Sequence, residues 1–252
     1  MEIIVFGEGM RQKAATAYLE SAASDIETLG ISRTVLLPIP TTKDEKTIHG
    51  TDVSLFELRE KVRAGDFVIG YGIPEECASF IREGGAVVYD ALFDEKFQEE
   101  NAYLTALGAV AKILTCDVRS PKGIRLGVVG YGRIGKEIVK IWLFLGGSVR
   151  VFSGRRDVVE ALVSVGVSAL TYGEGCDFSG VDILINTAPA PIINSCDTGL
   201  SDVEKIIDLA SGEYLKGIPR VEKMPSIPAK MYPVSAGKIY AERAISYLGG
   251  VK

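Results

Sequence analysis

The segment LGVVGYGRIG, residues 126–135, carries the strongest pattern in the sequence. A short apolar run ends at Gly130, and Gly130, Gly132 and Gly135 stand in the spacing G-x-G-x-x-G before a helical pattern begins. In such a strand, turn and helix, the first glycine permits a sharp turn and the second lets the backbone approach a pyrophosphate, while the third lets the helix pack closely on the strand. The segment therefore predicts a dinucleotide site, with a purely structural turn as the alternative.

The alternation of short apolar runs and helix-length segments continues after this motif. We expect strands at 126–129, 149–152, 168–170, 182–187 and 205–210, a weaker strand at 221–224, and helices at about 133–145 and 157–165. This order is typical of a doubly wound, mostly parallel sheet. We therefore assign residues 120–235 to a Rossmann dinucleotide-binding domain.

A second α/β unit precedes this domain. Strands are expected at 2–6, 34–38, 66–70 and 86–90, and a helix at 11–29. We expect residues 1–100 to form a flavodoxin-like substrate domain, residues 101–119 to form a linking helix, and a helix over 236–252 to pack back on the first domain. The predicted fold class is α/β, with two doubly wound domains of which the second is the Rossmann domain.

Composition excludes several classes of function. The formal net charge is −5, and acids and bases are mixed along the chain, so no basic stripe is present for a nucleic-acid backbone. The sequence shows no signal-peptide pattern and no uncharged apolar run of roughly 20 residues, so we expect no membrane span and a cytoplasmic location. Four scattered cysteines and one histidine indicate neither a metal site nor a disulfide framework.

The segment VRVFSGRRD, residues 149–157, bears on the choice of cofactor. An acid at the end of this strand would bond the ribose 2′-hydroxyl of NAD, but Ser153 occupies that position and Arg155 and Arg156 follow. Guanidinium groups match phosphate oxygens, so the segment favours NADP, with NADPH preferred over NADH. The alternative is a solvated arginine pair on a loop.

Two later strands end in polar residues, INTAPA (185–190) and IIDLAS (206–211). Ligands of doubly wound sheets lie beyond the carboxyl ends of the strands, so we expect these ends to form two walls of one cleft. The predicted cofactor-binding residues are Gly130, Gly132, Arg133, Ile134, Gly135, Ser153, Arg155, Arg156, Asn186, Thr187, Ala188, Pro189, Asp208 and Ser211.

Taken in order along the chain, the longer motifs form a more specific pattern. These are FGEGMRQ (6–12), LPIPTTKD (37–44), NAYLTALG (101–108), LGVVGYGRIG, INTAPAPIIN (185–194), IIDLAS and SIPAKMYPVSAG (226–237). Together they resemble dipicolinate synthase A, the first of the two polypeptides of dipicolinate synthase, and the similarity runs along nearly the whole chain.

The resemblance implies a two-domain NAD(P)-binding oxidoreductase similar in shape to the formate and glycerate dehydrogenases. It implies formation of dipicolinate from a cyclic intermediate of the lysine pathway in sporulating bacteria, together with a flavoprotein-like second subunit. The residues that fall on its motif positions are Arg11, Gln12, Thr42, Asn101, Thr105, Asn186, Ser235 and Gly237. Apart from Asn186 we expect these residues to bind a small dicarboxylate, and we also expect a homo-oligomer.

Several of these residues have simpler explanations. Arg11 either anchors a carboxylate or is a surface charge of the first helix, and Ser235 is expected to be the N-cap of the last helix. No residue is identified as the one that transfers protons.

The sequence also departs from the family. Leu107 stands where the family has a carboxylate, and SGEYLKG (211–217) replaces a Pro-Gly-Gly run. These departures leave open an altered substrate, or a nucleotide-binding regulatory or accessory protein. A D-2-hydroxyacid dehydrogenase is less favoured, because its histidine base would follow the glycine motif and the only histidine, His49, precedes it.

Overall fold

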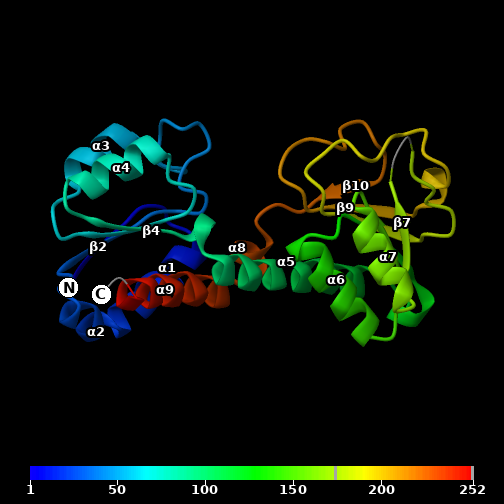
Figure 1. Ribbon diagram of the computed structural model, residues 1–252, viewed down its shortest axis with the longest axis horizontal. Coiled ribbons are helices and arrows are strands. Elements are labelled where there is room, and N and C mark those ends of the chain that lie inside the picture. Colours follow the sequence, from blue (N-terminus) through cyan, green and yellow to red (C-terminus); the bar gives the residue numbers. More distant parts are fainter. Residues whose placement is uncertain (173–174, 251–252) are drawn as a thin grey trace. The chain divides into compact units, whose positions relative to one another are not determined.

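The computed structural model describes residues 1–172 and 175–250 (Figure 1). The chain forms two compact units, one made of Met1–Asn101 with the segment from Pro228 onward, the other of Ala102–Ile227. Each unit holds a sheet of parallel strands, which confirms the predicted α/β class with two domains. The first unit also takes in residues 228–235, which the sequence pattern had placed in the second. Residues 173–174 and 251–252 fall inside predicted ranges and lie outside the described residues.

The first unit has a four-stranded sheet in the order β1-β2-β3-β4. We expected a flavodoxin-like domain here without predicting a strand order, and the observed order differs from the order 2-1-3-4-5 of flavodoxin itself. The elements are β1 (Glu2–Val5), α1 (Met10–Ser21), α2 (Ala23–Thr28), β2 (Arg33–Leu36), α3 (Leu55–Lys61), β3 (Phe67–Gly70), α4 (Glu75–Glu83), β4 (Val87–Asp90), a 3₁₀ turn (Ala91–Phe93) and α9 (Pro233–Gly250).

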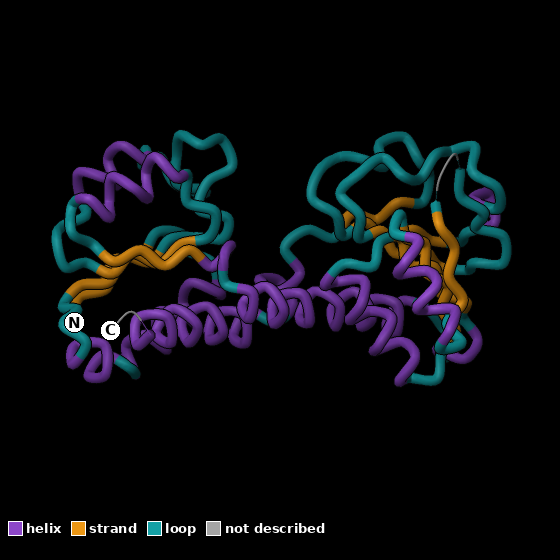
Figure 2. Tube along the Cα trace, in the orientation of Figure 1, coloured by secondary structure: helices purple, strands orange, loops and turns teal. Residues whose placement is uncertain are grey.

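Helices cover both faces of this sheet, as a doubly wound domain requires. Figures 1 and 2 show α3 and α4 on one face of the sheet and α1 and α9 on the other. Alternate residues of β2 point to opposite faces, so Leu36 packs with α1 and α9 and Val35 packs with α3 and α4. Helices α3 and α4 were not predicted from the sequence. For α3 a signal was present, because Ser54 and Glu57 form a capping box, in which each side chain bonds the other residue's backbone N–H.

Helices α1 and α9 approach each other closely at Gly237. A side chain there would overlap the carbonyl oxygen of Arg11 and lie 2.7 Å from the Cβ of Ala14. This position therefore has a packing requirement for glycine, and the return of the last helix onto the first unit depends on it.

We expect Gly237→Ala to lower the free energy of unfolding by about 1–3 kcal/mol, because the added methyl group forces the two helices apart. Urea denaturation followed by circular dichroism measures the change. Gly249→Ala is the matched control, since a side chain at 249 meets no atom within 4 Å. Equal stability of the two variants would contradict the close packing.

The second unit has a six-stranded sheet in the order β10-β9-β8-β5-β6-β7. Counted from β5, this is the Rossmann order 3-2-1-4-5-6, so the predicted Rossmann domain is confirmed. Its elements are α5 (Glu95–Cys116, which begins in the first unit), β5 (Arg125–Val129), α6 (Arg133–Phe144), β6 (Ser148–Ser153), α7 (Arg156–Ser164), β7 (Ser168–Thr171), β8 (Ile183–Asn186), β9 (Lys205–Asp208), β10 (Val221–Lys223) and two 3₁₀ turns (Pro121–Gly123 and Leu200–Asp202). Helix α8 (Ile227–Met231) begins at the last residue of this unit, and its other residues belong to the first unit.

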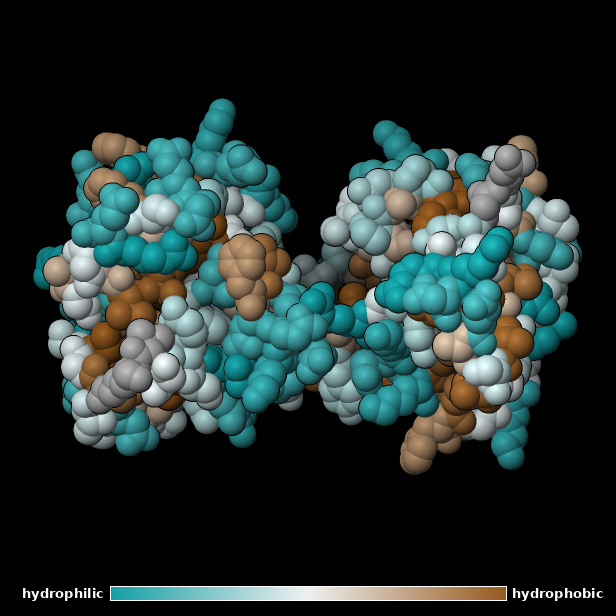
Figure 3. Space-filling view, viewed as in Figure 1, coloured by the Kyte–Doolittle hydropathy of each residue, from teal (hydrophilic) through white to brown (hydrophobic). Residues whose placement is uncertain are grey.

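The surfaces of the units are mixed in character. In Figure 3 hydrophilic residues cover much of the visible face of each unit and separate smaller apolar areas. None of the described helices is both long enough and apolar enough to span a lipid bilayer.

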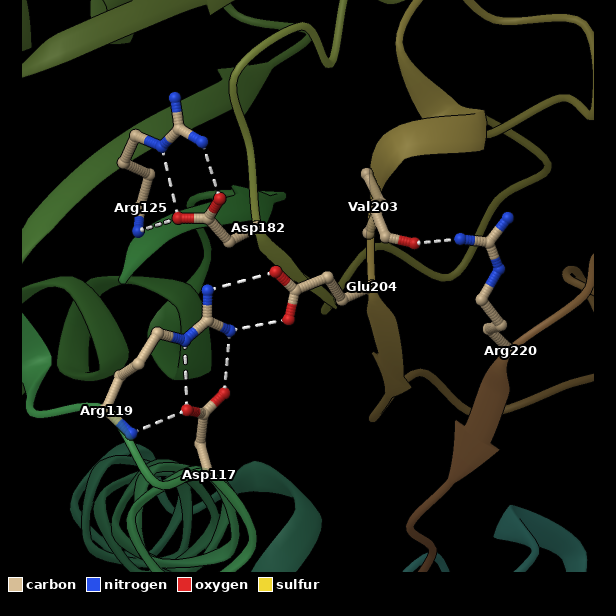
Figure 4. Close-up of polar contacts among 7 residues, drawn as sticks. All are labelled: Asp117, Arg119, Arg125, Asp182, Val203, Glu204 and Arg220. Carbon is tan, nitrogen blue, oxygen red and sulfur yellow. Dashed lines mark hydrogen bonds and ion pairs between the residues drawn. The ribbon is translucent and has the colours of Figure 1, made fainter. Parts of the chain in front are cut away.

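Ion pairs connect the amino ends of strands in the second unit to one another and to the end of α5 (Figure 4). The carboxylate of Asp182, just before β8, accepts hydrogen bonds from the backbone N–H of Arg125 at 2.7 Å and from its Nη2 at 2.6 Å. Arg119 bridges Asp117, which follows α5, and Glu204, which precedes β9, at 2.8 and 2.6 Å. These contacts join the end of α5 to the sheet.

This network predicts a loss of stability in acid. Hydrogen bonds from Arg119 hold the pKa of Asp117 at about 2, and those from Arg125 lower the pKa of Asp182. Because both pKa values lie below those of the unfolded chain, the stabilisation is complete above about pH 4 and is lost as the pH falls towards 2. We expect Asp182→Asn to lower the free energy of unfolding at pH 7 by about 1–2 kcal/mol and to flatten its pH dependence between 4 and 2. Urea titrations at each pH measure both effects, and an unchanged slope would contradict the assignment.

Candidate functional site

The turn after β5 has the geometry that a dinucleotide-binding turn needs. Gly130 has a φ of +91°, a left-handed conformation that favours glycine, and a side chain there would lie 2.6 Å from Oγ1 of Thr187. The Thr187 hydroxyl donates to the carbonyl oxygens of Val129 at 2.9 Å and Gly130 at 3.3 Å. Thr187, at the end of β8, therefore holds the turn in shape.

The other two glycines differ from each other in what surrounds them. Gly132 is the N-cap of α6, and no atom lies within 4 Å of the place where its side chain would stand. At Gly135 a side chain would overlap the carbonyl oxygen of Gly130, so this glycine lets helix and turn pack together. Ile134 packs against the core, whereas Arg133 is exposed on the first turn of α6.

This arrangement fits the pyrophosphate of a dinucleotide. The first amides of α6 have no carbonyl partners within the helix, and the helix dipole adds partial positive charge in front of them. The space at Gly132 is at the same helix terminus. Any residue other than glycine at this position would place its side chain in that space. The three glycine roles expected from the sequence are thus present in the backbone.

The two predicted walls, at the ends of β8 and β9, are joined directly. The side chain of Asn186, 1% exposed, donates from Nδ2 to Oδ1 of Asp208 at 2.9 Å, and its Oδ1 accepts from the N–H of Ala188. Asp208 is 2% exposed and also accepts from the N–H of Ala210. Asn186 and Asp208 therefore bond chiefly to the protein and fix the edge of the sheet. Pro189 and Ser211 are exposed at this edge, and Ala188 is buried.

Lys223 also belongs to this group, although the sequence did not predict it as a site residue. Its Nζ lies 3.1 Å from Oδ2 of Asp208 and also donates to the carbonyl oxygen of Gly212. A signal was available, because Lys223 ends the weak strand expected at 221–224, and the ends of neighbouring parallel strands meet at one edge. The ammonium group neutralises a buried carboxylate and ties down the loop after β9.

The segment after β6 differs from the simple arginine pair that we expected. Ser153 is buried, and its Oγ accepts a hydrogen bond from the N–H of Arg155 at 3.2 Å, so the serine shapes the turn. Arg155 pairs with Asp157 on the first turn of α7, with Nη2 and Oδ2 2.5 Å apart. Both groups are exposed, and their mutual hydrogen bonds raise the pKa of Arg155 and lower that of Asp157. Arg156 is exposed, and its guanidinium forms no ion pair with any residue in the described part of the chain.

Arg11 is buried, so the interpretation as a surface charge is wrong. It is 7% exposed, and its Nη2 donates to the carbonyl oxygen of Ile39 at 2.8 Å. Its Nε–H is buried and has no hydrogen-bond partner among the described residues. Burial lowers the pKa of Arg11, and the charges that act on it belong to the tyrosine pair Tyr240 and Tyr71 rather than to a carboxylate. A buried cation with a free donor is the local chemistry of an anion site.

The other residues predicted to bind substrate come from several elements. Gln12 is 6% exposed and lines a hollow beside β1, and Thr42 donates to the Asp44 carboxylate in the loop after β2. Asn101 and the buried Thr105 lie four residues apart on α5 and so share a face. Gly237 has the packing role described above.

The structure also bears on the interpretation of three further residues. Ser235 is the third residue of α9, which begins at Pro233, so the prediction that it is the N-cap is wrong. Leu107 is half-buried on α5. His49 belongs to the first unit, and its pKa is lowered by burial and by Lys43, which fits a loop histidine better than a catalytic one.

Comparisons with known proteins identify solved structures that have a similar fold. No family model matches the sequence, and no curated protein matches it. The chain is similar to the crystal structure of dipicolinate synthase A from Bacillus halodurans, with a TM-score of 0.74 and 19% identity over 98% of this chain and 97% of the other. Dipicolinate synthase A from Bacillus subtilis gives 0.75 and 19% over 100% and 96%. The transhydrogenase from Sinorhizobium meliloti gives 0.60 and 17% over 99% and 94%.

At these identities the similarity establishes the fold alone. The resemblance found in the sequence motifs is confirmed at that level: the chain has the two-domain fold of these structures, and its second sheet has the Rossmann strand order.

Proposed function

We propose that the protein is an NADP-dependent oxidoreductase similar to dipicolinate synthase A. Its substrate would be a cyclic dihydro- or tetrahydrodipicolinate intermediate of the lysine pathway, converted towards dipicolinate. The observation that carries the proposal is the open N-terminus of α6 at Gly132, placed at the first turn of a sheet with the Rossmann strand order.

The reaction depends more on the positioning of substrate and cofactor than on strong acids or bases. Oxidation of a dihydropyridine dicarboxylate removes one hydride and one proton, and the aromatic product supplies driving force. A bound nicotinamide would supply the hydride acceptor. The chain's own part is to hold the pyrophosphate at the α6 amides, to keep the turn rigid through Thr187, and to bind a carboxylate with Arg11.

The preference for NADPH is part of the proposal, and the Arg155–Asp157 pair makes it testable. A 2′-phosphate near α7 would compete with Asp157 for Arg155, because both are anions, while Arg156 keeps its donors. We expect wild type to bind NADPH more tightly than NADH. Asp157→Asn should raise NADPH affinity about 3- to 10-fold relative to NADH, a modest effect because the pair is exposed.

Neutralising the arginines is the converse experiment. Arg155→Gln with Arg156→Gln should abolish or reverse the preference for NADPH, as measured by fluorescence titration with both nucleotides. Equal affinities in wild type, or a double variant that still prefers NADPH, would contradict the assignment of these residues to the phosphate.

The proposed partners follow from the same assignment. They are a small dicarboxylate, further copies of this chain and a flavoprotein-like second subunit. We retain the cytoplasmic location expected from the sequence. A nucleotide-binding accessory protein without turnover is the second candidate, favoured by Leu107 at the position of the family carboxylate. Titration with NADPH, followed by a turnover assay with NADP⁺ as the hydride acceptor and the cyclic intermediate as substrate, separates the two: a protein that binds nucleotide without turnover is the accessory protein.

A further inference from the structure

One edge of the first sheet is open. β1 is the end strand and pairs with β2 alone. The N–H groups of Glu2 and Phe6 donate towards the β2 side, at 2.9 Å each, so the alternation of the strand turns the backbone groups of Ile3 and Val5 outward. Val5 is 37% exposed. Such an edge is a natural place for association with another chain.

Helix α1 lies beside this edge and borders a hollow with it. The hollow is about 570 Å³ in volume and lies between β1 and one face of α1. The amide of Gln12 lines it, and although this residue is only 6% exposed, its side chain has no hydrogen-bond partner among the described residues. The hollow therefore offers a polar group that the chain itself leaves unused.

The face of α1 that lines the hollow has a symmetric pattern of charge. Lys13, Thr16, Ala17 and Glu20 follow the spacing i, i+3, i+4, i+7, so they form one stripe along α1. Lys13 and Glu20, at its ends, are exposed, and neither forms an ion pair within the described part of the chain. The middle of the stripe consists of two small side chains.

We propose that this stripe and the adjoining edge of β1 form the interface of a two-fold homodimer. A two-fold axis through the point between Thr16 and Ala17 sets α1 antiparallel to its copy, so Lys13 of each chain meets Glu20 of the other. The small central residues allow the helices to approach closely. A second copy is the occupant that this pattern fits, because only its symmetry brings the two opposite charges together twice.

The test uses charge reversal in the full chain, measured by sedimentation velocity over a range of concentrations. Wild type is expected to dimerise. Lys13→Glu sets two acids against each other and Glu20→Lys two bases, so each should weaken dimerisation roughly 10- to 100-fold. The variant with both changes restores two attractive pairs and should dimerise like wild type. An equimolar mixture of the two single variants should form mixed dimers.

Two controls keep the result specific. Lys216→Glu makes the same change of charge on an exposed residue of the second unit and should leave dimerisation unchanged. Circular dichroism of each variant shows that it is folded. A monomeric wild type overturns the proposal. So does a dimer that the single variants leave intact, and so does a mixture of single variants that fails to associate, because any other interface or partner would give one of these results.

Discussion

Gly132→Ala is expected to weaken nucleotide binding at least about 100-fold, equivalent to about 2.7 kcal/mol, while the protein stays folded. The added methyl group would stand in the open space in front of the first amides of α6, where the pyrophosphate has to approach. Within the free protein it meets no atom within 4 Å, and the φ of −80° at this position suits any residue. The free energy of unfolding should change by less than about 1 kcal/mol.

Gly135→Ala is the matched control for this prediction. Its methyl group would overlap the carbonyl oxygen of Gly130, so this variant should lose about 1–3 kcal/mol of stability through strain in the turn. Thermal denaturation and titration with NADPH on both variants separate the two effects. Normal NADPH affinity in Gly132→Ala would show that the turn is only structural.

Arg11→Met is expected to make the protein more stable and less able to bind a dicarboxylate. The guanidinium is buried with an unpartnered Nε–H, so an unbranched apolar side chain should raise the free energy of unfolding by about 1–3 kcal/mol. The same change removes the charge-assisted hydrogen bonds to a carboxylate and should weaken binding of pyridine-2,6-dicarboxylate at least about 30-fold.

A gain in stability together with a loss of ligand affinity would identify Arg11 as a residue that serves binding at a cost in stability. Thermal denaturation measures the first, and calorimetric titration with the dicarboxylate measures the second. Arg11→Lys keeps the charge without the planar donor and should bind with intermediate affinity. A less stable Arg11→Met variant with unchanged ligand affinity would show that Arg11 is a structural residue instead.

The second unit could be predicted from the sequence because its signals are local. The central strands β5 and β8 are short apolar runs, α6 has an apolar face, and three glycines mark the turn between β5 and α6. The close approach of Gly135 to Gly130 is a local contact, whereas the hydrogen bond from Thr187 to the turn comes from a distant part of the sequence. Local patterns of this kind survive folding with little change.

Features that depend on distant contacts could not be predicted. The burial of Arg11 depends on α9, which returns from the other end of the sequence and packs at Gly237. The order of strands in the first sheet is likewise set by packing rather than by any segment alone. The Arg155–Asp157 pair could have been predicted from the sequence, because the two residues stand on either side of the start of α7.

The central claim is that the start of α6 holds the pyrophosphate of a nicotinamide dinucleotide. Isothermal titration calorimetry of the wild-type chain with NADPH and with NADH tests it most directly. We expect saturable binding of one nucleotide per chain, tighter for NADPH and lost in Gly132→Ala. The absence of saturable binding for both nucleotides, with the protein shown to be folded, would contradict it.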